Sequence, residues 1–289
     1  MSNKQSTGKH VLITGCSSGI GRACVFHLAA RGFSVLAGVR KQADAAGFAG
    51  QGAIRGLVVD VTMPQTIAAA VQTVNEVAGE SGLAGLVNNA GIGVVGPIEF
   101  VPPEEWRRQM EVNLIGQIAM TQAMLPMLRR HAQQYGTARI VMIGSIAGRV
   151  GQPIMGPYCA SKRALAAVSD VLRLELRGQR IQTSLIEPGA TQSEIWRKGL
   201  EATANVAKDS PARQDYGTLI DAIAAAANKA ASSAVPALRV ARAVERCLTR
   251  RYAPTRILVG RDAKMVAALK ACLPDRWFDA VLRRVLGSP

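Results

Sequence analysis

Aromatic residues are scarce in this chain: phenylalanine, tryptophan and tyrosine together make up 4% of its 289 residues. Proteins that bind single-stranded nucleic acids stack the bases on aromatic side chains placed among Lys and Arg. The scarcity therefore argues against nucleic acid as a partner. Long apolar runs are missing as well, and without a run of about 18 apolar residues a membrane-spanning helix is not expected.

The first ten residues, Met1 to His10, are polar. A secretory signal peptide needs an apolar segment there, so we expect a cytoplasmic protein. The five cysteines form no Cys-x-x-Cys pair, and the three histidines are isolated from one another. This spacing favours neither a disulfide framework nor a structural zinc site. We predict a protein of a reducing compartment with no metal site.

Acidic residues are few, 20 against 35 Lys and Arg, which gives a net charge of +15. Between Pro236 and Pro289 the chain carries 12 basic and 4 acidic residues. Five arginines recur there at helical spacing: Arg239, Arg242, Arg246, Arg250 and Arg251. A solvated helix face, an anionic ligand or a peripheral contact with anionic lipid would each fit this pattern. Charge alone does not choose among them.

Strand-like and helix-like segments alternate from residue 10 to about residue 190. Short apolar runs predict strands at Val11–Thr14, Phe33–Val39, Gly56–Asp60, Leu83–Val87, Arg139–Ile143 and Ile181–Ile186. Helical patterns cover Gly21–Arg31, Met63–Val77, Glu104–Leu128 and Tyr158–Leu176. Strands that are apolar throughout are buried on both faces. The sequence therefore predicts an α/β fold with a single doubly wound, Rossmann-type parallel sheet and helices on both faces.

No composition shift or linker divides the chain, so we expect one domain over residues 1–289. Within it, residues 10–191 would form the dinucleotide-binding and catalytic core. Residues 192–235 are Ala-rich and helical, and would cover the substrate. Residues 236–289 would form a basic, helical C-terminal extension, with a further strand at Arg256–Val259.

A glycine-rich turn, Thr14-Gly-Cys-Ser-Ser-Gly-Ile-Gly21, follows the first predicted strand. Glycines permit a tight turn and a close approach of the backbone to a pyrophosphate at the N-terminus of the next helix. Its place between a strand and a helix is typical of a dinucleotide-binding site. We assign the contacts with this cofactor to Gly15, Ser17, Ser18, Gly19, Ile20 and Gly21.

Arg40 stands 19 residues after Gly21, at the end of the second predicted strand. An acidic residue there would bond the ribose 2′-hydroxyl of NAD, whereas Arg accommodates the 2′-phosphate of NADP. NADP(H) is therefore preferred, and NAD(H) is the alternative if Arg40 is only a solvated surface residue. Asp60 is placed to contact the adenine, and Asn88-Asn89 can also satisfy open backbone groups at the sheet edge. Expected cofactor contacts at the ends of the third and fourth strands are Asp60, Val61, Asn88, Ala90 and Gly91.

Ser145 follows the fifth predicted strand, and Tyr158 and Lys162 share one face of the next helix. A free tyrosine titrates near 10, but a nearby ammonium and an oxidised nicotinamide ring both favour the phenolate and lower its pKa. Tyr158 would then exchange a proton with the substrate oxygen. Ser145 would hydrogen-bond that oxygen and stabilise its developing charge.

From about Val11 to Ile195 this set of motifs resembles the short-chain dehydrogenase/reductase family. The resemblance implies that Tyr158 and Lys162 also contact the cofactor. It adds Asn113, which would bend its helix and hold a proton-relay water. The implied catalytic residues are Asn113, Ser145, Tyr158 and Lys162. Contacts with the nicotinamide amide would come from Pro188 and Gly189 and from a hydroxyl that follows them, that of Thr191 or Ser193.

Four segments are most similar to the retinol and hydroxysteroid dehydrogenase branch: Leu36-Ala-Gly-Val-Arg40, Asp60-Val-Thr62, Leu172-Arg-Leu-Glu-Leu176 and Leu273-Pro-Asp-Arg-Trp-Phe278. The branch implies a lipophilic alcohol or carbonyl substrate, and the family implies a homodimer or homotetramer built on helices near residues 105–130 and 158–176. A nonenzymatic dinucleotide-binding protein is the alternative from another class.

Apolar residues in loops beyond the strands are candidates for a substrate pocket or for ordinary core. They are Ile92, Val94, Val95, Val150, Ile154, Met155, Ile195 and Trp196. Near the C-terminal end, Trp277 and Phe278 are expected to be packing anchors of the last helix.

Overall fold

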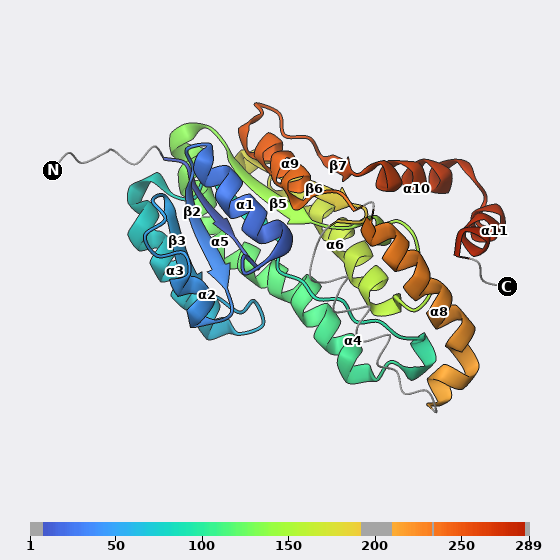
Figure 1. Cartoon of the computed structure of the whole chain (residues 1–289). Coiled ribbons are helices and arrows are strands. Elements are labelled where there is room, and N and C mark those ends of the chain that lie inside the picture. Colours follow the sequence, from blue (N-terminus) through green and yellow to red (C-terminus); the bar gives the residue numbers. More distant parts are fainter. Residues whose placement is uncertain (1–7, 192–209, 233, 287–289) are drawn as a thin grey trace.

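The computed structural model describes residues 8–191, 210–232 and 234–286. Seven strands form one sheet in the order β3-β2-β1-β4-β5-β6-β7, and every neighbouring pair is parallel. The strands are β1 (His10–Ile13), β2 (Ser34–Val39), β3 (Ile54–Val58), β4 (Gly85–Asn88), β5 (Ala138–Ile143), β6 (Ile181–Pro188) and β7 (Arg256–Val259). Figure 1 shows helices on both faces of the sheet. The predicted doubly wound α/β fold is confirmed.

Helices cover the sheet in two layers. One layer contains α3 (Pro64–Ala78), α5 (Gly116–Tyr135) and α6 (Gly156–Glu175), and the other contains α1 (Gly19–Ala30) and α9 (Ala237–Thr249). A short helix, α2 (Gln42–Ala46), lies between β2 and β3 and had no counterpart in the sequence analysis. The layers thus follow the predicted strand–helix order with one small addition.

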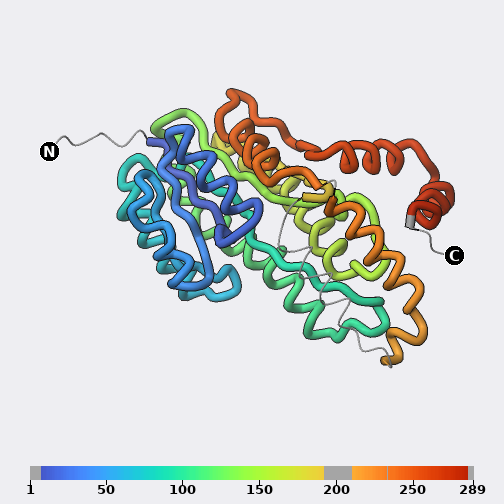
Figure 2. Tube along the Cα trace, in the orientation of Figure 1, coloured from blue at the N-terminus to red at the C-terminus, as the bar shows by residue number. Residues whose placement is uncertain are grey.

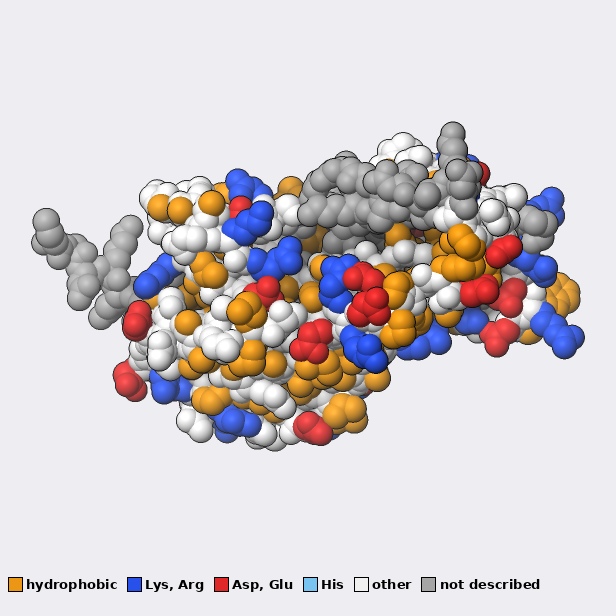
Figure 3. Space-filling view, turned by 90° about the horizontal axis from the view of Figure 1, so that it is seen from below, with side chains coloured by type: hydrophobic (Ala, Val, Ile, Leu, Met, Phe, Trp, Pro, Cys, Tyr) orange, Lys and Arg blue, Asp and Glu red, His pale blue; other side chains and the backbone are white. Residues whose placement is uncertain are grey.

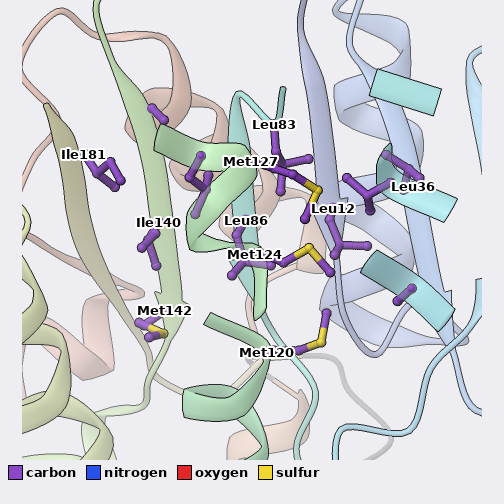
Figure 4. Close-up of a cluster of buried hydrophobic side chains, with 14 of the residues drawn as sticks. Leu12, Leu36, Leu83, Leu86, Met120, Met124, Met127, Ile140, Met142 and Ile181 are labelled. Atoms are coloured by element: carbon purple, nitrogen blue, oxygen red, sulfur yellow. The ribbon is translucent and has the colours of Figure 1, made fainter. Parts of the chain in front are cut away.

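Successive residues of a strand point into opposite layers. Leu12 packs in the cluster that contains Met120 and Met124, whereas Val11 and Ile13 pack against the layer of α1 and α9. Figure 4 shows the first of these clusters, with side chains of the sheet facing the methionines of α5. Burial on both sides explains why the strands are apolar throughout in the sequence.

The single helix predicted over Glu104–Leu128 is three segments in the structure. These are α4 (Pro103–Met110), a π-helical turn (Glu111–Ile115) and α5. Gly116 begins α5 where the helix approaches Val61, and a Cβ at Gly116 would lie 2.7 Å from Val61 Cγ2. The π turn therefore lies where the helix passes closest to the end of β3.

Helix α9 has one face in the core and one face exposed to solvent. Its buried residues Val240, Val244 and Cys247 pack in the cluster that holds α1. The five arginines noted in the sequence, at and after this helix, are all exposed. Exposure fits each of the readings given for these arginines and does not choose among them.

Helix α10 (Arg261–Cys272) packs Ala263 and Ala267 against Ile146, and it leads to α11 (Asp275–Leu286), which projects from the body in Figures 1 and 2. Phe278 is buried, as expected of a packing anchor, but Trp277 is 69% exposed, so the expectation for Trp277 is wrong. Within the described ranges, none of the helices combines the length and apolarity needed to span a bilayer. The division at residues 191 and 235 stays a prediction, and residues 192–209 lie outside the described part.

Candidate active site

The candidate site lies at the carboxyl edge of the sheet, where β1 and β4 are neighbours. The chain leaves β1 toward α1 on one face of the sheet and leaves β4 toward α5 on the other, so the loops after these two strands diverge. In open α/β sheets this divergence leaves a crevice that binds ligands. The glycine turn follows β1 and the Asn-Asn-Ala-Gly segment follows β4, which places both motifs at the crevice.

The glycine turn leads directly into α1. Gly15 and Gly19 have φ angles of +70° and +54°, which favour glycine. A Cβ at Gly21 would lie 2.2 Å from the Gly15 carbonyl oxygen, so the turn needs a bare backbone there. Ser18 is the N-cap of α1 and makes no side-chain capping bond. The first N–H groups of α1 are thus left for an anion, and the turn fits the pyrophosphate of a dinucleotide.

Thr14 and Asn89 hold this turn against β4. The Thr14 Oγ1 accepts hydrogen bonds from the backbone N–H groups of Asn89 and Ala90, both at 3.0 Å. The Asn89 side-chain amide donates to the carbonyl oxygens of Thr14 and Gly15 at 2.9 and 3.0 Å. Asn89 therefore fulfils the backbone-satisfying role considered for the asparagine pair, although it was not among the assigned site residues.

Asn88 has a different environment. It is fully buried, and its amide donates to Thr121 Oγ1 at 2.8 Å and faces the sulfur of Met142. Its side chain therefore points into the layer of α5 and away from the glycine turn. Gly91 lies against Asn113, because a Cβ there would be 3.3 Å from Asn113 Oδ1.

Three of the other assigned cofactor contacts follow β2 and β3. Arg40 comes directly after β2 and is exposed. Asp60 is half-buried, and its Oδ1 accepts hydrogen bonds from the backbone N–H and the hydroxyl of Thr62. Val61 is buried in the core beside α5. Arg40 and Asp60 thus lie at the carboxyl ends of β2 and β3, whereas the Val61 side chain belongs to the core, and the contacts of all three with a cofactor stay predictions.

Ser145, Tyr158 and Lys162 come together after β5 and at the start of α6. All three side chains are buried. The Ser145 hydroxyl is hydrogen-bonded to the Tyr158 phenol and also accepts from the backbone N–H of Ala147 at 3.1 Å. Lys162 Nζ donates to the carbonyl oxygen of Ile143 at 2.8 Å and lies 5.9 Å from the centroid of the Tyr158 ring. The expected Ser-Tyr-Lys constellation is therefore present in space.

Burial controls the ionisation of this group. It raises the pKa of Tyr158 to about 12, although the hydrogen bond from Ser145 acts in the opposite direction. It also lowers the pKa of Lys162 to about 8. The sequence predicts a lowered pKa for Tyr158, whereas in the protein without cofactor this pKa is raised. Desolvation of the phenolate outweighs the hydrogen bond from Ser145.

Asn113 lies in the π turn between α4 and α5, which is the irregularity expected there. Its amide donates to the Ile92 carbonyl oxygen at 3.0 Å and to Ser161 Oγ at 3.1 Å, and its Oδ1 accepts from the Ile92 N–H at 2.8 Å. The side chain thus fixes the loop after β4 to α6. The relay water implied by the resemblance stays a prediction.

Two buried glutamines, four residues before and after Asn113, hold the same loop. Gln109 accepts from the Val94 N–H at 2.6 Å and donates to the Ile92 carbonyl oxygen at 2.9 Å. Gln117 donates to the Ala90 carbonyl oxygen at 2.7 Å. Neither glutamine was among the predicted site residues, and the signal for them was an amide at every fourth position of an otherwise amphipathic helix.

A buried ion pair joins the loop after Ser145 to β6. Glu187 is 1% exposed, and the Arg149 guanidinium donates to its two carboxylate oxygens at 2.8 and 2.6 Å. The turn at Pro188 and Gly189 follows at once, and Thr191 Oγ1 donates to the Gly189 carbonyl oxygen. The other candidate hydroxyl, that of Ser193, lies outside the described residues.

Apolar side chains surround the Tyr158 ring. Ile154, Met155 and Ile220 of helix α8 (Pro211–Ser232) are buried in one cluster with it, and Val95 packs against them. Val94 and Val150 are also buried, and Ile92 is half-buried. Ile195 and Trp196 lie outside the described residues. Three of the pocket candidates, Val95, Ile154 and Met155, therefore lie in the cluster of Tyr158.

Comparison with known proteins agrees with this geometry. Residues 9–204 match the short chain dehydrogenase family model. The chain belongs to this family and is an oxidoreductase with an NAD(P)-binding Rossmann fold.

Particular relatives extend over nearly the whole chain. The NADPH-dependent 3-dehydrocapnine reductase of Ornithobacterium rhinotracheale is 34% identical over 96% of this chain and 97% of its own length. Retinol dehydrogenase 5 of Mus musculus is 35% identical over 96% of this chain and 89% of its own. A short chain dehydrogenase from Burkholderia cenocepacia, crystallised in complex with NADP, has a TM-score of 0.72 at 25% identity, with 99% and 100% of the two chains covered. The resemblance to the retinol and hydroxysteroid dehydrogenase branch is confirmed.

Proposed function

We propose that this chain interconverts a lipophilic secondary or primary alcohol and its ketone or aldehyde with NADP(H). The observation that carries the proposal is the buried Ser145, Tyr158 and Lys162 group beside a dinucleotide turn at the same sheet edge. Bound NADP(H) would supply or accept the hydride. The chain's own residues position both reactants and move the proton.

The cofactor would lie across the crevice, with its pyrophosphate at the N-terminus of α1. Arg40 is exposed after β2 and, among the described residues, forms no ion pair. Its guanidinium is thus available for a 2′-phosphate, which suits its planar fork of donors. The NADPH-dependent relative and the NADP-bound structure support this preference over NAD(H).

The proton would pass through Tyr158. With a pKa of about 12, its phenol is protonated at neutral pH and can donate to the oxygen of a carbonyl substrate. Without substrate, the Ser145 and Tyr158 hydroxyls share a hydrogen bond. A bound substrate oxygen would lie where it accepts from both hydroxyls. The protonated phenol is the form that a carbonyl-reducing step requires.

The substrate would be lipophilic because apolar side chains line the approach to Tyr158. Ile154, Met155 and Ile220 lie in its cluster, and a few polar groups in an apolar pocket are typical of sites for small molecules. The relative named for retinol supports the same class.

A substrate screen with NADP⁺, NADPH, NAD⁺ and NADH tests this proposal, with steroids, retinoids, long-chain alcohols and small ketones as candidates. We expect turnover of a lipophilic alcohol or ketone with NADP(H) and a loss of about 10²- to 10⁴-fold in Tyr158→Phe, which should still bind the cofactor. Tyr252→Phe, at a 76% exposed tyrosine, is the matched control. Equal or tighter binding of NADH contradicts the role of Arg40, and dinucleotide binding without turnover favours a nonenzymatic binding protein.

We also propose a cytoplasmic homodimer or homotetramer built on α5 and α6. Ile115, Val171 and Leu174 support it, because they expose 47%, 50% and 64% of their surfaces beside or on these helices. A monomer in light scattering at micromolar concentration would contradict it. Fractionation of the expressing cells checks the location.

Peripheral contact with anionic lipid is proposed for α11 instead of the arginines of α9. Trp277, Val281 and Val285 are exposed at a spacing of four residues, and Arg283 and Arg284 lie beside them. Figure 3 shows hydrophobic and basic side chains together at the end of the molecule where α11 projects in Figure 1. An exposed apolar stripe flanked by arginines is typical of helices that lie on membranes.

A further inference from the structure

Asp262, in the first turn of α10, touches the turn that follows β6. Its Oδ2 accepts a hydrogen bond from the Ala190 N–H at 2.6 Å, across 72 positions of sequence. A Cβ at Gly189 would lie 2.1 Å from the same oxygen. The carboxylate therefore occupies the space where a side chain at position 189 would stand.

A second glycine lets Asp262 reach this place. Strand β7 pairs with β6 so that Val259 lies opposite Pro188, and the Gly189 N–H donates to the Val259 carbonyl oxygen at 2.9 Å. Gly260 then has a φ angle of +113°, and a Cβ on it would lie 2.2 Å from Asp262 Oδ1. The carboxylate is thus enclosed between two glycines, one on each chain segment.

The turn that Asp262 holds is the one that the family resemblance assigns to the nicotinamide half of the cofactor. Its other groups are bonded within the protein as well. The Ala190 carbonyl oxygen accepts from the Val235 N–H at 3.0 Å, and Thr191 Oγ1 donates to the Gly189 carbonyl oxygen at 3.2 Å. Asp262 supplies the charged acceptor in this set, and hydrogen bonds to ionised acceptors are the stronger ones.

Helix α10 also supports the loop that carries the catalytic serine. Its residues Ala263 and Ala267 are buried in one cluster with Ile146, which directly follows Ser145. One face of α10 thus contacts the Ser145 loop, while its first turn bonds the backbone after Gly189. The C-terminal extension is connected to both sides of the reacting centre.

We propose that Asp262 is a positioning residue for the cofactor. Its carboxylate holds the Pro188–Thr191 turn in the conformation that receives the nicotinamide half, and the C-terminal extension is thereby part of the cofactor site. The inference rests on the proposed function, because it takes this turn as the nicotinamide contact.

The test compares two ligands that share their adenosine half. NADPH carries the nicotinamide, whereas adenosine 2′,5′-bisphosphate keeps the 2′-phosphate and lacks it. In titrations monitored by calorimetry or fluorescence, Asp262→Ala should weaken NADPH binding about tenfold, as the loss of a charged hydrogen bond to the backbone implies. Its affinity for adenosine 2′,5′-bisphosphate should equal that of the wild type, because Arg40 and the glycine turn are unchanged.

Two further variants separate positioning from folding. Asp262→Asn keeps an oxygen that accepts from the Ala190 N–H, and it should recover most of the NADPH affinity. Asp279→Asn removes an exposed carboxylate from α11 and should behave as the wild type. A parallel loss of both ligands in Asp262→Ala, together with a lower melting temperature, would show a merely structural role and overturn the proposal.

A double variant tests the contact itself. Gly189→Ala would place a methyl group against the Asp262 carboxylate and should weaken NADPH binding. In the Asp262→Ala background this clash is gone, so the same substitution should have little further effect. Additive losses contradict the proposal, and so does wild-type affinity for NADPH in Asp262→Ala. If the wild type itself binds neither ligand, the proposed function fails and this inference fails with it.

Discussion

At the scale of single residues, the reacting centre shows how burial sets protonation. The ordinary pKa values of Tyr158 and Lys162 are 10.0 and 10.5, and the folded protein moves them in opposite directions, to about 12 and about 8. Both shifts disfavour the charged form of the group, as desolvation does. Burial therefore favours the neutral phenol of Tyr158. The same burial makes the charged ammonium of Lys162 lower the stability of the folded state.

Lys162→Met should stabilise the fold at pH 7 while it removes activity. Because the pKa of Lys162 is lower in the folded state, the unfolded chain binds more protons between about pH 8 and 10.5, and stability rises with pH over that window. Below pH 8 the ammonium costs stability in full, so its removal should raise the melting temperature by about 2 to 5 °C. Turnover should fall at least ~100-fold. Thermal melts at pH 7 and kinetics check both effects.

The advantage of this variant should disappear above about pH 10.5, where the lysine is neutral in both states. Lys229→Met, at an exposed lysine of α8, is the matched control and should change neither quantity. A Lys162→Met protein that melts below the wild type at pH 7 would contradict the argument. Tyr158 has the reverse sign, since its raised pKa makes stability fall as pH rises from about 10 to about 12.

At the scale of elements, the continuous segment of α4, the π turn and α5 holds the loop that follows β4. Gln109, Asn113 and Gln117 lie one turn apart, and their amides bond backbone groups between Ala90 and Val94. All three are fully buried. Buried amides that satisfy loop backbone are costly to replace, because each loss leaves an unpaired polar group.

Gln109→Leu should destabilise the protein by about 1–3 kcal/mol, because the Val94 N–H loses its acceptor and the Ile92 carbonyl oxygen loses one of its donors. In the proposed function this loop would face the substrate, so the KM of the substrate should rise more than the Kd of NADPH. Urea unfolding and steady-state kinetics measure the two effects. Gln122→Leu, at an exposed position of α5, serves as the control. An unchanged urea midpoint would contradict the role of Gln109 in holding this loop.

The sequence predicted this region only in part, and the reason is physical. Hydrophobic periodicity detects the helix over Glu104–Leu128, but the π turn at Glu111–Ile115 leaves the apolar pattern almost unchanged. The π turn is followed at once by a tertiary contact, the approach of Gly116 to Val61, which the apolar pattern of the helix does not report. Asn113 was found through the family resemblance and not from the pattern. The strands, in contrast, were predicted within a few residues because burial on both faces gives an unmistakable apolar run.

At the scale of the whole molecule, the arginines of the C-terminal segment lie on elements with different surroundings, among them α9, which is packed, and α11, which projects. The arginines of α9 lie on the solvent side of a helix whose other face is core. Glu245 of the same helix bonds His27 and Arg31 and ties α9 to α1. The composition locates the charge in the C-terminal segment. It does not tell that α9 is packed and α11 projects, because the path of this segment depends on the pairing of β7 with β6.

Binding to anionic vesicles should depend on α11 and not on α9. Each Arg near an anionic surface contributes about 1 kcal/mol, so the double variant Arg283→Glu with Arg284→Glu should weaken cosedimentation with phosphatidylglycerol vesicles at least ~10-fold. Trp277→Ser should weaken it as well, because the exposed ring is the largest apolar group of the stripe. Pure phosphatidylcholine vesicles should bind little, and added salt should release the protein.

Charge reversal on α9 gives the matched comparison. Arg239→Glu with Arg242→Glu changes the net charge by the same amount at exposed positions of a packed helix. If the long-range field of the whole protein drove binding, both double variants would lose affinity equally. If the stripe on α11 inserts at the interface, the α9 variant should keep most of its binding and still carry out turnover. Equal losses would assign the contact to overall charge and remove α11 as its site.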